Sequence, residues 1–588
     1  MHPAFCVFAS VIVIGLAMAP TRVIAAEPPS VSAARQFIAD YEAAVRPLEI
    51  AAAKADWQAQ ASGRSEDYKA SEEAQNRVDT ALADPAAFGR LKQIRQDLGK
   101  LEPGPDRLLA RQIELLYLQY SGKQLDPELL RQITAKATAI TRAFNVYRAR
   151  VDGRELPESE VRKVLRESRD SVYRRAVWEA GKDVGGLVEK DLKELVKLRN
   201  EAARRLGYRD FYEMQLQLSE MTKERILKLF DELYDLMREP FRDAKARIDA
   251  KLAAEYGIGV AGLRPWHYSD PFFQEPPAMY TGLLDPIYAR ADVVKLAAAF
   301  YAGIGLPIDD VIARSDLYER PGKYPHAMCN DMDREGDIRV MANVVANYQW
   351  MSTMLHELGH AVYDKYIPRS LPYVLRTPAA TFTTEAIAMM FERLAGQPGW
   401  MEAMGLTVPD PKAVAEAGAR MRRDHILIFA AWAQVMVRFE SAMYADPDQD
   451  LNRLWWDLVE KYQLVHRPDG RNAPDYASKI HLISSPVYYH SYMMGEMFAS
   501  QLHRVIVRDV LKAAGRTTGP AAGGQSGLAG ACYHGRKEIG EFLKARVFGP
   551  GASLRWDELV RHATGEDLGP RAMMAEIAEA DRAWSEGE

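Results

Sequence analysis

The stretch WMSTMLHELGHAVYD, from Trp350 to Asp364, contains the pattern H-E-x-x-H in His356, Glu357 and His360. On an α-helix, residues four apart lie on one face, so both imidazoles can point at the same metal ion. Zinc suits two imidazoles and a carboxylate, and it brings the pKa of bound water to about 7. Glu357 is then placed to take a proton during attack on a peptide carbonyl. The stretch predicts a metallopeptidase site that lacks one ligand.

The flanking residues favour a helix, which is the context that this motif requires. Apolar residues recur at helical spacing, and the first proline comes only at Pro368. The apolar face consists of Met351, Met354, Leu355, Leu358 and Val362. The alternative interpretation is a purely structural helix that carries two histidines.

The missing ligand is expected on a second helix downstream. The segment TFTTEAIAMMFERL, Thr381 to Leu394, offers Glu385 just after a threonine-rich start. Thr383 or Thr384 is expected to cap this helix, which places Glu385 in its first turn, where the helix dipole favours a carboxylate. Glu392 is the rival ligand, and it is interpreted as a solvated acid or one that supports the ligands from outside.

Length and composition predict a large soluble globular protein. The chain has 588 residues, which exceeds the usual size of one hydrophobic core, so several subdomains or two lobes are expected. Apolar residues make up 48% and charged residues 27% of the chain. The net charge of −5 gives no reason to expect nucleic acid or an anionic membrane as a partner.

The N-terminus is typical of a secretory signal. The apolar run from Ala4 to Ala19 is shorter than a spanning helix, and small residues follow at Ala25 and Ala26. The sequence therefore predicts a signal peptide over residues 1–26 and a secreted or periplasmic catalytic chain over 27–588. An uncleaved anchor remains the alternative, and no other stretch is apolar enough to span a bilayer. After cleavage, Cys329 and Cys532 remain and are expected to be free thiols.

The chain up to about residue 260 is expected to form long helices. Pro127 to Val151 and Glu189 to Tyr208 are examples, with apolar residues at three- and four-residue spacing. The proline- and aromatic-rich segment Arg264 to Pro277 predicts a packed loop, and helix resumes near Asp292. From there the metal-site part of the chain is expected to run to residue 588.

The segment DIRVMANVV, from Asp337, is the strongest strand candidate. It leads into the metal helix and is expected either to bind an extended peptide as an added strand or to be an ordinary buried strand. Further helices are expected over Ala413–Tyr444, Leu451–Tyr462, Pro486–Leu511 and from Arg536 to the end, with a mobile loop at 515–530.

Motifs around HELGH carry a family resemblance. His326 lies in PHAMCNDMDREGDIRVMANVV, and after Glu385 come WWDLVEKYQ at Trp455 and SKIHLISSPVYYHSYMMGEMF from Ser478. In order and spacing, this series resembles the angiotensin-converting-enzyme family of zinc peptidyl-dipeptidases, over roughly residues 266–502. The N-terminal helices match only in general character.

The resemblance implies a role for individual residues. His356, His360 and Glu385 would hold one zinc ion per chain, with Glu357 as the general base. His481 and Tyr492 fall where the family places groups that polarise the scissile carbonyl and stabilise the oxyanion.

The resemblance also implies how substrate is held. His326 and Ala327 fall where the family binds the substrate backbone. Lys479 and Tyr489 match two groups that hold the C-terminal carboxylate of the substrate. The family's third carboxylate contact, a glutamine, aligns with Tyr268.

Some positions depart from the family pattern. The arginine that binds activating chloride is replaced by Ser491, and the arginine after the paired tryptophans is replaced by Val459, so chloride activation is doubtful. Pro325 replaces the cysteine that precedes the backbone-binding histidine. The gap between His360 and Glu385 is one residue longer, and EAIAMMFERL is similar to the E-A-x-x-x-M-x-E run of thimet-type oligopeptidases.

These observations predict a mainly α-helical, two-lobed zinc metallopeptidase with a deep central cleft and a small β element beside the HExxH helix. The expected function is release of dipeptides from the C-terminus of oligopeptides. Internal cleavage of short peptides is the enzymatic alternative, and a catalytically silent peptide-binding protein is the non-enzymatic one. The sequence does not indicate an oligomeric state.

Overall fold

The computed structural model describes residues 27–102, 104, 106–277, 281–324, 326–512 and 532–585. The predicted signal peptide at 1–26 and the predicted loop at 515–530 lie outside the described residues. Cys329 and Cys532 are both free, as predicted.

The N-terminal part is mainly helical, as the apolar spacing predicts, with one short hairpin described below. The predicted helix at Glu189–Tyr208 corresponds to the middle and end of α9. The helices are α1 (Pro29–Ala44), α2 (Arg46–Ser62), α3 (Ser65–Leu82), α4 (Pro85–Leu98), α5 (Arg107–Ser121), α6 (Pro127–Val146), α7 (Glu158–Glu167), α8 (Ser171–Lys182), α9 (Val184–Arg205), α10 (Phe211–Leu218) and α11 (Lys223–Tyr256).

The predicted helix from Pro127 to Val151 is too long by five residues. It ends at Val146, and strand β1 (Ala149–Val151) pairs antiparallel with β2 (Arg154–Leu156). The two strands are joined by Asp152 and Gly153, which both adopt positive φ angles, of 51° and 75°. Asp-Gly is a strong signal for a two-residue hairpin turn, and here it outweighs the helical periodicity.

The segment from Arg264 to Pro277 is a packed loop with a single 3-10 turn, as predicted. The elements after it are α12 (Thr281–Tyr288), α13 (Val293–Gly303), α14 (Asp309–Arg314), β3 (Met328–Asp331), β4 (Ile338–Met341), α15 (Tyr348–Tyr366), α16 (Thr381–Glu392), α17 (Pro398–Ala403), α18 (Pro411–Ala445), α19 (Leu451–Gln463), α20 (His481–Ser484), α21 (Tyr489–Val505), α22 (Lys537–Leu543), α23 (Trp556–Thr564) and α24 (Arg571–Ser585).

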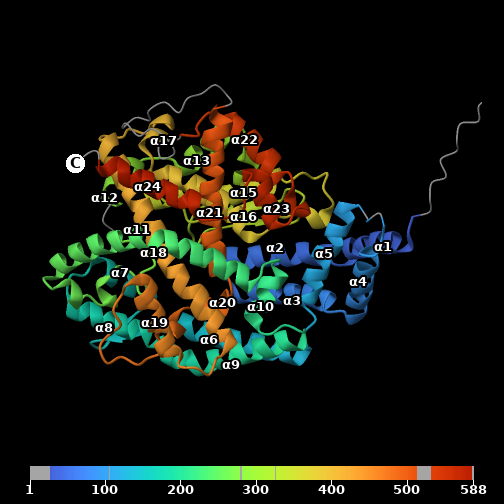
Figure 1. Cartoon of the computed structure of the whole chain (residues 1–588), viewed down its shortest axis with the longest axis horizontal. Coiled ribbons are helices and arrows are strands. Elements are labelled where there is room, and N and C mark those ends of the chain that lie inside the picture. Colours follow the sequence, from blue (N-terminus) through green and yellow to red (C-terminus); the bar gives the residue numbers. More distant parts are fainter. Residues whose placement is uncertain are drawn as a thin grey trace, which may run out of the picture.

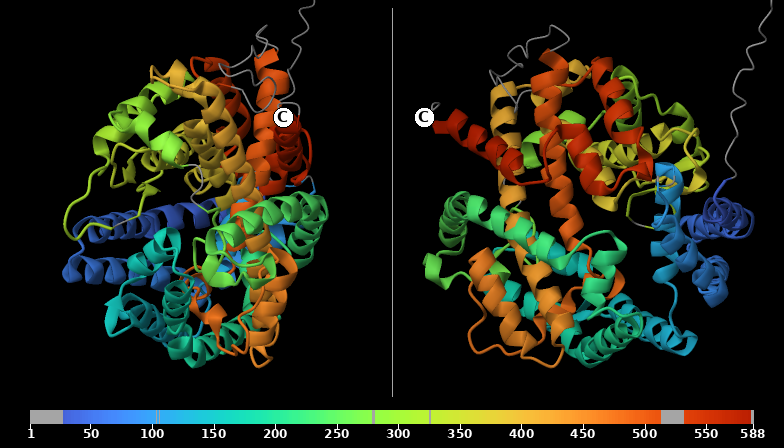
Figure 2. Two further views of the ribbon diagram at one scale, coloured as in Figure 1. Left: turned by 90° about the vertical axis from the view of Figure 1, so that its left-hand side faces the viewer. Right: turned by 45° about the vertical axis from the view of Figure 1, so that its right-hand side comes forward.

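Most helices form an upper and a lower group, and α1 to α5 lie on the right-hand side, as Figure 1 shows. The upper group contains α12, α13, α15 to α17 and α22 to α24, and the lower group contains α6 to α10, α19 and α20. Two helices, α18 and α21, run from one group into the other, and α11 crosses between them; Figure 2 shows the same arrangement from two other sides. The metal helices therefore lie in the upper group, against α21.

Helix α18 is long and apolar enough to cross a membrane by length and composition, contrary to the prediction that no segment after the signal is. Of its most apolar 18-residue window, 83% is buried inside the protein. Its apolar character is explained by its position, since it packs against α11, α19 and α21 in the core.

The predicted strand at Asp337 is β4, and it is an inner strand. One edge pairs with β3, from Met328 to Asp331. On the other edge, the backbone N–H of Asp316 donates to Val340, and the N–H of Ala342 donates to Asp316, both at 2.9 Å. Among the described residues, β3 pairs only with β4, so the open edge beside the metal helix belongs to β3.

Two glycines allow α16 to approach its neighbours closely. A Cβ atom on Gly359, within HELGH, would lie 2.7 Å from the Cα atom of Ala388. A Cβ atom on Gly495, in α21, would lie 3.0 Å from the Cβ atom of Glu385. The helix that carries Glu385 is therefore held between α15 and α21 at distances that only glycine permits.

Candidate active site

The three predicted metal ligands come together. His356 and His360 bring their Nε2 atoms within 3.1 Å of each other. The Oε2 atom of Glu385 lies 3.6 Å from the first Nε2 atom and 3.9 Å from the second. A tetrahedral zinc site with bonds of about 2.0 Å separates its ligand atoms by about 3.3 Å, so this set fits zinc. Within the described part of the chain, no other group of three His, Cys, Asp or Glu side chains is close enough to hold a metal ion.

A partner behind each ring fixes the orientation of the two imidazoles. The Nδ1 atom of His356 lies 2.6 Å from Oε2 of Glu392, and a carboxylate only accepts, so Nδ1 donates and Nε2 is the nitrogen turned toward the other ligands. The Nδ1 atom of His360 lies 2.7 Å from the hydroxyl of Thr384. Such partners orient metal ligands and raise their basicity. Glu392 is therefore outside the ligand set, as predicted, and supports it.

The predicted capping of α16 is wrong. The N-cap residue is Ala380, and no side chain caps the helix. The hydroxyl of Thr383 donates back to the carbonyl of Ala380 at 2.7 Å, and Thr384 is used by His360 instead. Because the helix starts at Thr381, Glu385 lies in the second turn, where the dipole adds little.

Glu357 lies within this group and is 8% exposed. Burial raises the pKa of its carboxyl to about 7; the positive charge of His356 opposes the shift, and the carboxylates of Glu385 and Glu392 add to it. A carboxyl group that titrates near neutrality is suited to accept and return a proton. A divalent cation held by the neighbouring ligands would favour its ionised form.

Three tyrosines at the start of α21 lie beside the third ligand. The hydroxyl of Tyr488 donates to Oε1 of Glu385 at 3.2 Å. The ring of Tyr492 packs on those of Tyr488 and Tyr489, with centroids 4.9 and 5.7 Å apart. Burial and the charge of Glu385 raise the pKa of Tyr492 to about 12, so its phenol remains a hydrogen-bond donor.

His481 lies beside these tyrosines, with its ring 5.2 Å from that of Tyr489. Burial and the nearby charge of Lys479 lower the pKa of His481 to about 4, so the imidazole is neutral at pH 7. Its Nδ1 atom is buried without a hydrogen-bond partner among the described residues. A buried polar atom left unpaired costs about 1–3 kcal/mol, so native proteins rarely keep one without a reason. A hydrogen bond to a bound ligand is one such reason.

Lys479 is buried in an aromatic environment. Its Nζ atom lies 4.9 Å from the ring centroid of Phe272 and 5.6 Å from that of Tyr489. It donates to the side-chain oxygen of Gln274 at 2.9 Å. Burial lowers the pKa of Lys479 to about 8. The amide of Gln274 is neutral and does not balance the charge of this buried cation. Lys479 is therefore well placed to bind a carboxylate.

Tyr268 does not join this group. Its hydroxyl accepts from Lys245 at 2.8 Å and donates to Asp249 at 3.0 Å, so its polar atom is fully used. The expectation that Tyr268 contacts a substrate carboxylate is therefore corrected. Gln274 lies beside Lys479 instead, six residues later in the same loop.

His326 and Ala327 lead directly into the open strand β3. His326 is exposed, and its ring lies 5.3 Å from that of Tyr324. Ala327 immediately precedes Met328, the first residue of the strand. Both residues therefore lie where an extended chain would pair with this edge.

A cavity of about 680 Å³ is lined by Glu392, the acid that contacts His356. Helices α15, α16 and α18 line it, together with the loop that carries Gln274. Its volume is typical of a site for a small ligand. Residues from the three helices that line it include Ser352, Thr353, Met390, Met421 and His425.

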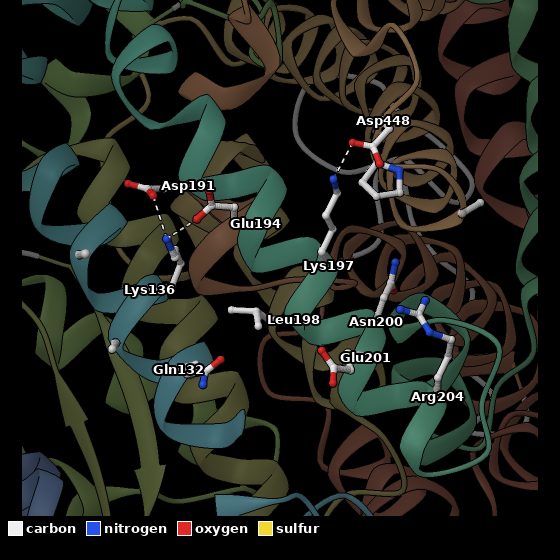
Figure 3. A pocket seen from close by; sticks show the side chains of 14 residues that line it. Gln132, Lys136, Asp191, Glu194, Lys197, Leu198, Asn200, Glu201, Arg204 and Asp448 are labelled. Carbon is white, nitrogen blue, oxygen red and sulfur yellow. Dashed lines mark hydrogen bonds and ion pairs between the residues drawn. The ribbon is translucent and has the colours of Figure 1, made fainter. Parts of the chain in front are cut away.

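A separate hollow of about 950 Å³ lies on the surface between α6 and α9 (Figure 3). Five of its charged residues are paired with each other. Lys136 contacts Asp191 at 2.9 Å and Glu194 at 2.5 Å, and Lys197 contacts Asp448 at 2.6 Å. These pairs leave little unpaired charge on this face, and the hollow contains none of the metal-ligand candidates.

Sequence reasoning missed three residues of the site. Gln274 stands in a loop without periodicity, and Thr384 was interpreted as a cap. Tyr488 was not assigned a role. The only signal for them was closeness in sequence to motif residues, which does not specify where a side chain points.

The converging ligands, the hydrogen bonds that orient their rings and the buried glutamate define the class of protein. It is a zinc metallopeptidase of the HExxH type with a glutamate as third ligand.

Comparison with known proteins identifies the family. The sequence model for angiotensin-converting enzyme, peptidase family M2, matches residues 29–267 and 270–580. This chain therefore belongs to the angiotensin-converting enzyme family of zinc peptidyl-dipeptidases.

Individual relatives agree with this assignment. Angiotensin-converting enzyme from Theromyzon tessulatum is 21% identical over 444 residues, which cover 70% of this chain and 69% of the relative. The enzyme from Bos taurus is 23% identical over 431 residues, covering 68% and 32% of the two chains. The enzyme from Oryctolagus cuniculus is 24% identical over 489 residues, covering 76% and 35%. The matched region thus spans about a third of the mammalian relatives.

Proposed function

We propose that this enzyme releases dipeptides from the free C-terminus of oligopeptides, with one zinc ion per chain held by His356, His360 and Glu385. The observation that carries the proposal is the buried Lys479 with Gln274 beside it. A chain of contacts joins this pair to the metal group: Lys479 lies over Tyr489, whose ring packs on Tyr492, Tyr492 packs on Tyr488, and Tyr488 donates to Glu385. A cation at a fixed distance from the metal selects substrates by their chain end.

The protein's own groups divide the work of hydrolysis. When bound, zinc supplies Lewis-acid chemistry, which polarises a carbonyl and acidifies water. Glu357 takes a proton from the attacking water and returns it to the leaving nitrogen. Tyr492 and the neutral His481 donate hydrogen bonds where negative charge develops on the carbonyl oxygen, each worth about 3 kcal/mol. The orphaned Nδ1 atom of His481 supports its role as a group that is paired only when substrate is present.

Substrate is held in two places. An extended peptide adds to the open edge of β3, next to His326 and Ala327, through its backbone. The C-terminal carboxylate binds Lys479, Tyr489 and Gln274. Backbone pairing sets the direction of the chain, and the carboxylate contact sets the number of residues beyond the cut.

Internal cleavage of short peptides is the second candidate function. The observation that favours it is Glu392, because the E-A-x-x-x-M-x-E run resembles thimet-type oligopeptidases and its second acid contacts His356 at 2.6 Å. Such an enzyme would not depend on the free carboxylate.

One peptide offered in two forms separates the two functions. Mass spectrometry of the products is compared for a free-acid and a C-terminally amidated peptide, with and without a chelator. Release of a dipeptide from the free acid alone supports the first function, and equal cutting of both supports the second. A Lys479→Met variant should lose the preference for the free acid. Absence of zinc-dependent cutting of either form would favour a silent peptide-binding protein, against which the presence of Glu357, His481 and Tyr492 argues.

We also propose where the enzyme acts and that it works without chloride. The apolar N-terminal segment supports an extracytoplasmic location, in the periplasm or outside the cell. Ser491 and Val459 replace arginines, and Val459 is a buried apolar residue, which supports activity without chloride. Turnover in chloride-free acetate buffer should then match turnover in chloride at equal ionic strength.

A further inference from the structure

A buried arginine on α9 binds the start of the segment between His481 and Tyr489. Arg199 is 6% exposed. Its guanidinium donates to the backbone carbonyls of Leu482 at 3.0 Å and Ile483 at 2.7 Å, and to the hydroxyl of Tyr444 at 3.1 Å. The arginine therefore binds the backbone of α20, directly after His481.

The other end of the same segment is held by a buried acid on α18. Glu440 is 2% exposed, and its Oε1 atom accepts the backbone N–H of Val487 at 2.8 Å. No ion pair joins Glu440 to Arg199 in the described residues, so each side chain contacts the backbone of this segment separately. Burial raises the pKa of Glu440 to about 8, with the N–H of Val487 and the charge of Arg199 opposing the shift.

Val487 adopts a conformation that valine avoids. Its φ angle is +58°, in the left-handed region, where a β-branched side chain clashes with its own backbone. Such strain persists only where surrounding contacts impose it, and it clusters at functional sites. Here the imposing contact is the hydrogen bond to Glu440.

The strained residue decides where α21 begins. Tyr488 follows directly, and the helix starts at Tyr489 without a side-chain cap. If Val487 relaxed to an extended conformation, the direction of this helix start would change, and with it the positions of Tyr488 and Tyr492 relative to Glu385.

We propose that Arg199 and Glu440 are positioning residues: they clamp the segment 482–487 at both ends and so place His481 and Tyr492 for catalysis. Neither residue touches the metal ligands or the substrate. The inference rests on the proposed function of His481 and Tyr492, and it adds a reason for the strained conformation of Val487.

The test compares variants of both members of the Glu440 contact. Glu440→Gln keeps an acceptor oxygen in place and should retain kcat within about twofold. Glu440→Leu removes the acceptor and should lower kcat roughly 10- to 100-fold with little change in KM, because a donor displaced by about 1 Å loses transition-state stabilisation. Val487→Gly makes the left-handed conformation accessible without the clamp. The double variant Glu440→Leu/Val487→Gly should therefore regain activity. Its kcat should be at least about a third of the kcat of the single Val487→Gly variant.

A control and a second measurement make the test decisive. Gln434, also buried on α18 and six residues before Glu440, donates to the carbonyl of Phe230 at 2.6 Å and not to segment 482–487, so Gln434→Leu should leave kcat unchanged. Hydrogen exchange of segment 482–489 should be about tenfold faster in Glu440→Leu and unchanged in Gln434→Leu. Failure of Val487→Gly to restore kcat, or unchanged exchange, would overturn the clamp. Absence of dipeptide release by the unaltered enzyme would instead overturn the proposed function, and exchange would still test the clamp.

Discussion

The Nδ1 atom of His356 lies 2.6 Å from the Oε2 atom of Glu392, two turns beyond Glu385 on the same helix. One helix therefore supplies both a metal ligand and the acid that orients another ligand. Because α16 carries both groups, a movement of this helix changes the ligand set and its support together.

Substitution of Glu392 should weaken zinc binding before it affects chemistry. Glu392→Gln keeps an acceptor for Nδ1 but removes the charge, so zinc affinity should fall about 10-fold, and Glu392→Ala should lower it by up to about 100-fold. Competition with a chromogenic chelator measures both values. If zinc affinity is unchanged in Glu392→Ala, the support has been assigned to the wrong residue.

Substitution of the proposed base should separate metal binding from turnover. Glu357→Gln should retain stoichiometric zinc and lower kcat at least about 10³-fold, because the amide cannot accept the proton. Metal analysis and peptide hydrolysis are measured on the same preparation. Retained turnover in a zinc-loaded variant would show that another group acts as the base.

The pH dependence of kcat/KM should show the loss of charge on Lys479. Burial lowers the pKa of this ammonium group to about 8, so it is charged below that pH and loses its charge as the pH rises through it. For a free-acid peptide, kcat/KM should fall about tenfold per unit above pH 8. Lys479→Arg stays charged, so its profile should be flat to higher pH. An amidated peptide should show no such limb, and an identical limb with both peptides would assign it to another group.

The close approach of α21 to α16 should be sensitive to a single methyl group. Gly495→Ala places a Cβ atom 3.0 Å from that of Glu385 and 3.2 Å from the sulfur of Met389, so overpacking should cost about 1–3 kcal/mol and lower zinc affinity. Gly186→Ala, in α9, meets nothing within 4 Å and serves as the control. Thermal unfolding and zinc titration of both variants test the difference.

The helical body and the metal group could be predicted because they depend on local spacing. Two histidines four apart must share a helix face, and the structure confirms that both of them converge with Glu385. Helix α18 and helix α19 were predicted within about two residues for the same reason, since their apolar residues repeat with the helical period.

The remaining contacts depend on how distant segments meet. Gln274 reaches Lys479 from a position 205 residues earlier, through a loop with no period. Thr384 was predicted to cap α16 because threonine prefers that position, but the neighbouring imidazole of His360 binds its hydroxyl instead. The hairpin at Asp152 and Gly153 was missed because the apolar spacing of the preceding helix continues into its first strand, up to Val151. In each case tertiary contact or turn chemistry outweighed the local pattern.

The position of β4 between β3 and the segment around Asp316 leaves one strand edge for an incoming chain. Main-chain pairing does not distinguish one side chain from another. An enzyme that reads its substrate this way can degrade a mixed pool of fragments, and it leaves intact any peptide whose tail is folded back or chemically blocked. Its turnover would follow the supply of loose chain ends rather than the presence of one particular sequence.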